Sequence, residues 1–367
     1  MKVQGFILID VDAAALNNAG TVSRAGIENA VETKKIKKEG CVYPYVAGQA
    51  WGNWWRNTLQ KDLKWVLSPI VKEDGQNIAY TQANPFKYPD DDIFGYMRAA
   101  KEPELDEKGE VKKNKNGKDK MKDATVTRIS PLKNSVLISI GNVQIARNFS
   151  SMSRQNDVPV PYGKEEYSAI MKGMFSLDVE QVGTFSSYNK TGFKNLNEKL
   201  KKEIESQCEK INDPYVFNKN GNPEILLRMK LDIRKQRIID TIKALKTITG
   251  GAMQTNNMVD VTPKLIILAV TKTGNHPFSH IISADPINHE QSIFNIADLK
   301  EVLKEYKEDF ISDIYIGKRG GFWNEYDKNI KDELISAKEN KPAINVHYYP
   351  VNEAIDNFCI VLKEIII

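Results

Sequence analysis

VQGFILIDV, residues 3–11, begins the chain with the alternation of a half-buried β-strand. One face of this strand carries Phe6, Leu8, Asp10 and Asp12, and the other carries Ile7, Ile9 and Val11. Successive side chains on a strand point to opposite faces, so the two acidic residues lie side by side. The pattern predicts an opening strand that packs apolar side chains and ends in a pair of carboxylates.

YPYVAGQAWGNWWRNTL, residues 43–59, predicts a helix that begins near Gly48. Trp51, Trp55, Leu59 and Leu63 recur every four residues and form a stripe to be buried. Gln49, Asn53, Arg56 and Gln60 form a second stripe, within about 60° of one another at 100° per residue. This second stripe is polar and contains no acid, so it suits an anionic partner.

Polar and basic residues separate the strand from the helix. The loop at residues 14–26 offers short polar side chains, and TKKIKK at 33–38 offers lysines. A helix N-terminus presents free backbone N–H groups, and with a basic loop beside it can hold a phosphate chain. We therefore predict contacts to a nucleic-acid backbone. The candidates are Asn17, Asn18, Ser23, Arg24, Lys34, Lys35, Gln49, Asn53 and Arg56.

The amino-acid composition limits which kinds of protein this chain can be. The net charge of +4 over 367 residues is mild, so nucleic-acid binding depends on where the cations lie. Three cysteines without a CxxC pair indicate structural thiols in a reducing compartment. Of the four histidines, His276 and His280 are four residues apart, but Pro277 between them argues against the helix that would bring them to one metal, and we expect no cofactor. With no signal peptide and no membrane-spanning run, the sequence predicts a soluble, cytoplasmic protein.

Strands and helices interleave along the rest of the chain. Residues 101–123 mix both charge signs with little to bury, which predicts a mobile solvated loop. We expect strands at 174–185 and 265–270, and helices near 196–210 and from 232 to Gly250. The end of the chain reads as strand, strand and helix, at 311–317, 344–349 and 351–365. The pattern predicts an α+β sheet with helices on one side.

Three further motifs are candidates for chemistry. GGAMQTNN at 250–257 combines two glycines with small polar side chains, which suits the close passage of a nucleic-acid backbone, and its Gln254 and Asn256 are candidate donors to RNA. RNFSSMSR at 147–154 offers Arg147, Met152 and Arg154 as further candidate contacts. Asp10 and Asp12 leave open a metal-dependent endoribonuclease, although the N-terminal block contains no third ligand. IGKRGGFW, with Lys318 and Arg319, has no assigned role.

Six stretches, in order over about residues 3–275, carry a family resemblance. They are FILIDVDAAALNNAG, YPYVAGQAWGNWWR, DDIFGYM, RNFSSMSR, MFSLDVEQVGTF and GGAMQTNNMVDVTPKLIILAV. Together they resemble the CRISPR RNA (crRNA) backbone subunit of type I Cascade, in the RAMP superfamily. The match is closest to the DevR-type autoregulator branch of type I-B systems.

The resemblance implies an α+β fold with an RRM-like (ferredoxin-like) palm at 1–67, 130–150 and 174–367. A finger at 68–129 and a thumb at 151–173 would interrupt this palm, and Met152 could act as a wedge between bases. The implied protein is not an enzyme. It lines up head to tail on the guide RNA as a helical filament within Cascade, and presents the RNA to target DNA for antiviral defence. A DNA-binding transcriptional autoregulator remains an alternative, although no helix-turn-helix pattern stands out.

Overall fold

A computed structural model describes residues 1–24, 27–72, 79–99, 101–104, 111–114, 116–152, 160–189, 194–335 and 344–367. It describes the backbone alone at residues 21–24, 27–29, 102, 123, 152 and 160. The chain divides into two compact units. The first unit contains residues 1–63, 133–177 and 239–367, and the second contains 64–132 and 178–238. The second unit thus joins the whole of the predicted finger, 68–129, to a stretch assigned above to the palm.

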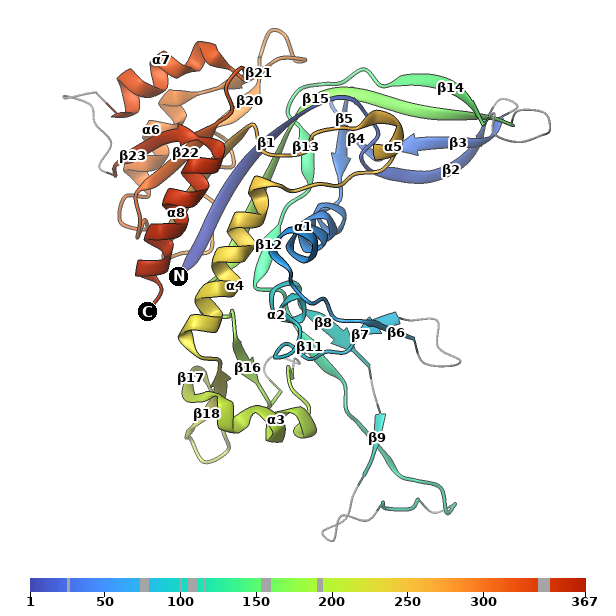
Figure 1. The fold of residues 1–367 in the computed structure, drawn as a ribbon, viewed down its shortest axis with the longest axis vertical. Helices are drawn as coiled ribbons and strands as arrows, with labels where there is room; N and C mark the ends of the chain where they lie inside the picture. The colour runs from blue at the N-terminus through green and yellow to red at the C-terminus, as the bar shows by residue number, and fades with distance from the viewer. Residues whose placement is uncertain are drawn as a thin grey trace. The chain divides into compact units, whose positions relative to one another are not determined.

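The first unit is built on a large mixed sheet, as the α+β prediction requires (Figure 1). Its main path runs β23-β22-β19-β1-β15-β13-β5-β4. In chain order these strands are β1 (Lys2–Ala14), β4 (Lys35–Lys38), β5 (Cys41–Val46), β13 (Leu137–Ser139), β15 (Val160–Asp178), β19 (Leu265–Thr271), β22 (Ile314–Lys318) and β23 (Val346–Pro350). Strands β2 (Asn18–Arg24), β3 (Ile27–Thr33), β12 (Leu132–Asn134) and β14 (Ala146–Met152) join it through β15.

Helices cover both faces of this sheet, so the prediction of helices on one side is wrong. Phe6 and Leu8 pack in one core with α6 (Ile296–Glu305). On the opposite face, α8 (Val351–Ile365) packs against Gly317, where an added Cβ would lie 2.8 Å from the Cα of Val351. β1 is therefore buried on both faces, and only Asp10, Asp12 and Ala13 near its end are exposed.

α1 (Gly48–Leu63) begins where predicted and buries its aromatic stripe. The indole N–H of Trp51 donates to Ser135 O at 2.6 Å, and that of Trp55 donates to Thr241 O at 2.7 Å. Trp54 is buried too, and it lies against Gly250, where a Cβ would be 2.1 Å from its ring. These three rings belong to the core, so they are not platforms for stacking bases.

β14 and the first half of β15 form an antiparallel hairpin that extends from the sheet (Figure 1). Its register runs from Ala146 opposite Glu166 to Met152 opposite Val160. Further along, β15 enters the main sheet, where Ile138 of β13 pairs with Lys172. The predicted strand at 174–185 is in fact the end of β15, followed by a turn and β16 (Thr184–Ser186).

Shorter elements complete both units. The first unit also has β20 (Ile282–Ala284), β21 (Ser292–Phe294), α5 (Gln254–Asn257) and α7 (Asp327–Ile330). The second has β6 (Ile70–Lys72), β7 (Ala79–Thr81), α2 (Pro89–Phe94), β8 (Tyr96–Arg98), β9 (Lys101–Pro103), β10 (Met121–Asp123), β11 (Val126–Arg128), β16, α3 (Glu198–Ile204), β17 (Glu209–Phe217) and β18 (Pro223–Arg228). α4 (Leu231–Lys243) begins in the second unit and ends in the first. Among the described residues no helix is long and apolar enough to cross a membrane.

The described part of the lysine-rich stretch at 101–123 forms a hairpin of β9 and β10, not a loop without structure. Glu104 links its two arms, because its carboxylate pairs with Lys112 and with Lys120, each at 2.8 Å. These two contacts lower the pKa of Glu104 to about 2. The mixed charges from which a solvated loop was predicted thus include the ion pairs that close the hairpin.

A buried carboxylate organises the second unit. Asp92 of α2 is fully buried and pairs with Arg128 of β11 and with Arg237 of α4, the latter at 2.6 Å. The backbone N–H of Gly183 also donates to Asp92, at 3.0 Å. The sequence motif DDIFGYM therefore supplies the anion that joins three separate segments of this unit.

We predict that Asp92→Asn lowers the free energy of unfolding by about 3 kcal/mol, because two buried guanidinium groups lose their counter-charge. Urea denaturation measures this loss. Asp232→Asn, at an exposed position of α4, is the matched control and should stay within about 0.5 kcal/mol of the wild type. An Asp92→Asn protein as stable as this control would contradict the assignment.

Candidate nucleic-acid interface

Three segments of the first unit meet at the N-terminus of α1. The side-chain Oδ1 of Asn17 accepts from the N–H of Ala47 at 2.9 Å, directly before the helix. The carbonyl of Asn17 accepts from Lys34 N, and the carbonyl of Lys34 accepts from Tyr45 N, both at 2.9 Å. Asn17 and Lys34, predicted separately from sequence, are therefore neighbours beside the helix start.

α1 presents its polar stripe as predicted. Gln49 and Asn53 are exposed, and Arg56 is half-buried. The first turn of the helix contains no acidic residue. The positive end of the helix and its donor side chains thus occur together, which is the arrangement that an anion requires.

A buried glutamate links two other predicted residues. Glu165 of β15 has a side chain only 4% exposed, and both its oxygens accept from Lys35 Nζ, at 2.8 and 2.7 Å. Oε1 also accepts from Arg147 Nε at 3.1 Å, and Oε2 accepts from the N–H of Thr33 at 3.0 Å. Lys35 and Arg147 are 112 residues apart, yet one carboxylate holds them both.

The charge state of Glu165 follows from this environment. Burial raises its pKa, but the hydrogen bonds from Lys35 and Thr33 outweigh burial, so the pKa lies below the usual value. The group is thus a carboxylate at neutral pH. Arg147 keeps its side chain 62% exposed while its Nε is held, so the side chain stays accessible to a ligand.

The loop at 250–258 approaches this region from the C-terminal half. Ala252 N donates to Leu16 O at 2.9 Å, which places the loop next to Asn17. Gln254, a predicted donor to RNA, is instead folded onto its own loop: its amide donates to Gly250 O and Val259 O, and accepts from Val259 N at 2.8 Å. Its amide groups hold the shape of the loop.

Other residues of this loop differ in their availability. Asn256 is exposed as predicted. Asn257, which the sequence analysis missed, donates to Ala13 O at 2.6 Å and to Glu166 at 3.1 Å. Asn257 thereby ties the loop to β1 and β15. No local signal distinguishes it from Asn256 in the sequence.

The structure describes the side chains of only some of the remaining predicted residues. Asn18 is half-buried, and its Oδ1 finds no hydrogen-bond partner among the described residues. The side chains of Ser23, Arg24 and Met152 lie outside the described part of the structure. Arg154 lies wholly outside the described residues. Their roles stay predictions.

Asp10 and Asp12 are exposed at the end of β1. Asp10 lines a cavity of about 480 Å³ together with Asp260, Lys264 and Arg319. Burial and the neighbouring Asp12 raise the pKa of Asp10, while Lys264 lowers it in part. Within the described ranges, no group of three or more His, Cys, Asp or Glu side chains could hold a metal ion.

The basic turn with Lys318 and Arg319 has a structural explanation. Lys318 is buried, and its Nζ donates to Phe322 O at 2.6 Å and to Asn324 Oδ1 at 3.0 Å. It also pairs with Asp327 at 3.1 Å. Arg319 is half-buried and reaches Asn352 at 3.4 Å. Lys318 therefore supports the turn and is not available to a ligand.

Comparison with known proteins identifies the family. A family model described as CRISPR-associated negative auto-regulator DevR/Csa2 matches residues 7–291. A search of curated protein sequences finds no match.

Two solved structures are similar over nearly the whole chain. A chain of a "CRISPR RNA-guided surveillance complex" has a TM-score of 0.51 at 8% identity, covering 99% of this chain and 100% of that one. A chain of a "CRISPR RNA-guided surveillance complex, pre-nicking" has a TM-score of 0.48 at 10% identity, covering 98% and 100%. At 8% identity, the similarity to the first of these two structures shows a similar fold and nothing more. The family match covers more than half of the 367 residues, and the chain therefore belongs to the CRISPR-associated DevR/Csa2 family.

Proposed function

We propose that this chain is a non-catalytic subunit that binds a CRISPR guide RNA along its sugar–phosphate backbone. The observation that carries the proposal is the group of donors beside the α1 N-terminus. Asn17 and Lys34 border the helix start, the polar stripe of α1 follows, and Glu165 holds Lys35 and Arg147. Family membership and a fold like that of a subunit of an RNA-guided complex support the choice of RNA.

Binding through the backbone leaves the bases free. Amides, lysines and arginines recognise phosphate and ribose without reading sequence. A guide must pair with target DNA through its base edges, so its holder has to accept any sequence. The proposed site, rich in amide and cationic donors, meets this requirement.

Copies of the chain would line up head to tail along one guide within a Cascade complex of type I-B, in the cytoplasm. A contact between two different surfaces that does not close on itself gives an open helical filament. In this arrangement the RRM-like palm carries the α1 site. The thumb at 151–173 includes the β15 arm of the β14–β15 hairpin, whereas most of β14 falls within the palm range 130–150. The finger at 68–129 supplies the β9–β10 hairpin.

Replacing Lys34, Gln49 and Arg56 together by alanine tests the site. Lys35 is left unchanged, because removing it would take from the buried Glu165 carboxylate one of the two cations, Lys35 and Arg147, that pair with it. We expect affinity for single-stranded RNA to fall at least about tenfold, because each hydrogen bond to a charged group contributes about 1.5–3 kcal/mol. The slope of log K against log salt should become shallower by about 1 to 2. Filter binding over a salt series measures both.

The matched control replaces Lys304 and Lys307 by alanine, which removes two exposed positive charges from α6 and the turn after it. This control should keep its affinity for single-stranded RNA within about twofold of the wild type. The wild-type protein should bind promoter DNA no more tightly than it binds RNA. Equal affinity of the triple variant and the control would refute the site. Preference for a specific promoter duplex would favour the autoregulator.

The absence of catalysis is tested separately. We expect complementary RNA bound to the assembled protein to remain intact in Mg²⁺, because Asp10 and Asp12 have no further ligand among the described residues. Gel analysis of end-labelled RNA checks this. Cuts at regular intervals that disappear in Asp10→Ala would show an endoribonuclease instead.

A further inference from the structure

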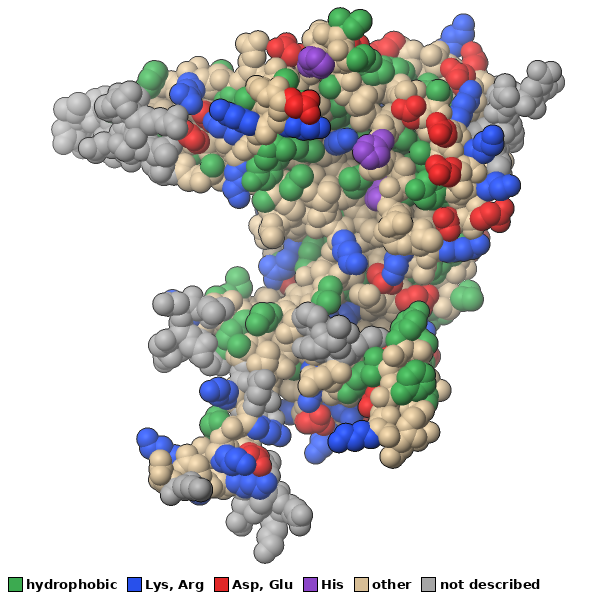
Figure 2. Space-filling model, turned by 180° about the vertical axis from the view of Figure 1, so that it is seen from behind, with side chains coloured by type: hydrophobic (Ala, Val, Ile, Leu, Met, Phe, Trp, Pro, Cys, Tyr) green, Lys and Arg blue, Asp and Glu red, His purple; other side chains and the backbone are tan. Residues whose placement is uncertain are grey.

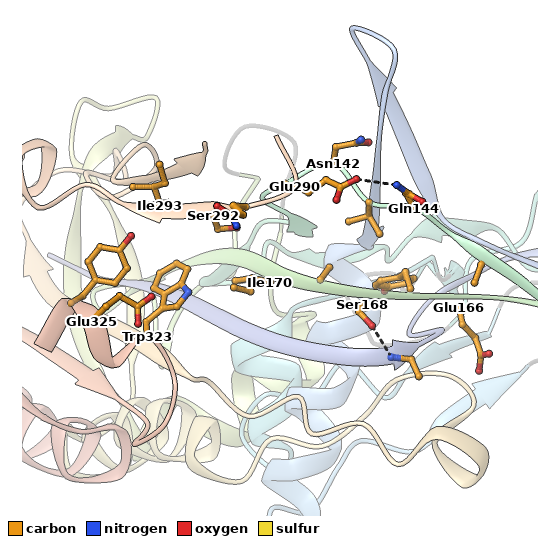
Figure 3. Close-up of a pocket in the computed structure, with 18 of the residues that line it drawn as sticks. Asn142, Gln144, Glu166, Ser168, Ile170, Glu290, Ser292, Ile293, Trp323 and Glu325 are labelled. Carbon is orange, nitrogen blue, oxygen red and sulfur yellow. Dashed lines mark hydrogen bonds between the residues drawn. The ribbon is translucent and has the colours of Figure 1, made fainter. Parts of the chain in front are cut away.

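A groove of about 1010 Å³ lies on the face of β15 opposite Glu165. Because side chains alternate along a strand, Glu166, Ser168 and Ile170 face this groove while Glu165 faces Lys35. The 141–146 segment forms one wall, and residues 290–293, which lead into β21, form another (Figure 3). The proposed RNA site does not use this face.

The groove is acidic. Its charged lining residues are Glu166, Glu290 and Glu325, and no Lys, Arg or His lines it within the described part of the chain. Lys164 pairs with Glu166 at 2.7 Å, whereas Glu290 accepts a hydrogen bond from the neutral amide of Gln144, at 3.1 Å. Glu290 and Glu325 are exposed. A phosphate chain would be repelled here, so the groove suits a cationic partner.

One end of the groove is aromatic. Trp323 and Tyr326 line it together with Glu325 (Figure 3). Trp323 is stacked on Phe322 at 4.7 Å between ring centroids and lies 5.5 Å from Tyr326. A tryptophan face beside carboxylates attracts lysine and arginine side chains through cation–π contacts as well as charge. The occupant that fits is a lysine-rich polypeptide segment.

This chain contains such a segment. Residues 111–122 (VKKNKNGKDKMK), at the end of the β9–β10 hairpin, have six lysines and one aspartate. All of them that the structure describes are exposed. Lysine side chains gather on this arm at the lower left of Figure 2. Even Lys113, which pairs with Asp119 inside the hairpin, keeps its side chain 61% exposed.

We propose that the acidic groove of one copy receives the lysine-rich hairpin of another copy. This inference rests on the proposed filament and names its contact surfaces. Groove and hairpin are two different surfaces, so the contact is heterologous and extends an open chain of copies. Charge complementarity would also favour this contact over groove against groove, which brings like charges together.

Charge reversal on each surface tests the contact. Glu290→Lys with Glu325→Lys makes the groove basic, and Asn116→Glu with Lys118→Glu makes the tip of the hairpin acidic. Sedimentation velocity on a long RNA measures assembly, and binding to an RNA that holds one copy measures the RNA site. We expect each variant to assemble on the long RNA at least about tenfold more weakly than the wild type. The affinity of the groove variant for the short RNA should change little. A control with Glu301→Lys and Glu305→Lys, exposed on α6, should assemble like the wild type.

Mixing the two variants gives the decisive result. In an equimolar mixture each groove meets a hairpin of opposite charge on the other variant, so assembly should return. If reversal of the groove leaves assembly unchanged, the inference is wrong. If both changes in one chain restore assembly but the mixture does not, the hairpin fills its own groove, which also overturns it.

Two more outcomes are distinct. If the hairpin variant binds the short RNA or target DNA more weakly and the mixture fails to assemble, the hairpin contacts nucleic acid instead of the groove, which overturns the inference. If the wild type binds short RNA but never assembles on long RNA, the filament of the proposed function fails, and this contact fails with it.

Discussion

Alternation along β15 is the constraint on which the rest of the account depends. This strand belongs to the hairpin with β14 and then to the main sheet between β1 and β13. Its odd-numbered side chains include Glu165 near Lys35, and Phe175, whose ring meets the edge of Trp55 at 5.0 Å. On its other face, Glu166, Ser168 and Ile170 line the acidic groove. A strand of period two thus gives opposite charge preferences to the two faces of one element.

In the proposed function, Glu165 positions the cations with which a protein of low net charge would hold a polyanion. A net charge of +4 gives little attraction at a distance, so local placement of cations has to supply the binding. The buried carboxylate fixes Lys35 and Arg147 before any ligand arrives, and the Asn17 contact fixes the start of α1. Pre-positioned donors lose less conformational entropy on binding than free lysines do.

Much of the fold was predictable because local pattern and burial agree. α1 begins at Gly48 and α8 spans 351–365 as predicted, β19 runs one residue past its predicted end, and β22 and β23 begin three and two residues later than predicted. Asn17 and Lys34 lie beside the start of α1, and their contacts with RNA stay predictions. The failures come from contacts between distant segments. No sequence pattern near Glu165 predicts its contacts with Lys35 and Arg147. Gln254 resembles a free donor in the sequence, but in the structure its amide oxygen accepts a hydrogen bond from the N–H of Val259. The β9–β10 hairpin depends on Glu104 crossing between arms, which a charge count does not show.

In the proposed function the guide RNA is held by its phosphates and riboses while its bases stay free. Chemical footprinting of a bound guide can separate the two kinds of contact, with phosphate ethylation interference and base methylation measured on the same complex. We expect interference at phosphates, and methylation of base-pairing edges as fast as in free RNA at most positions. Protected base edges throughout, with phosphates indifferent to ethylation, would contradict it.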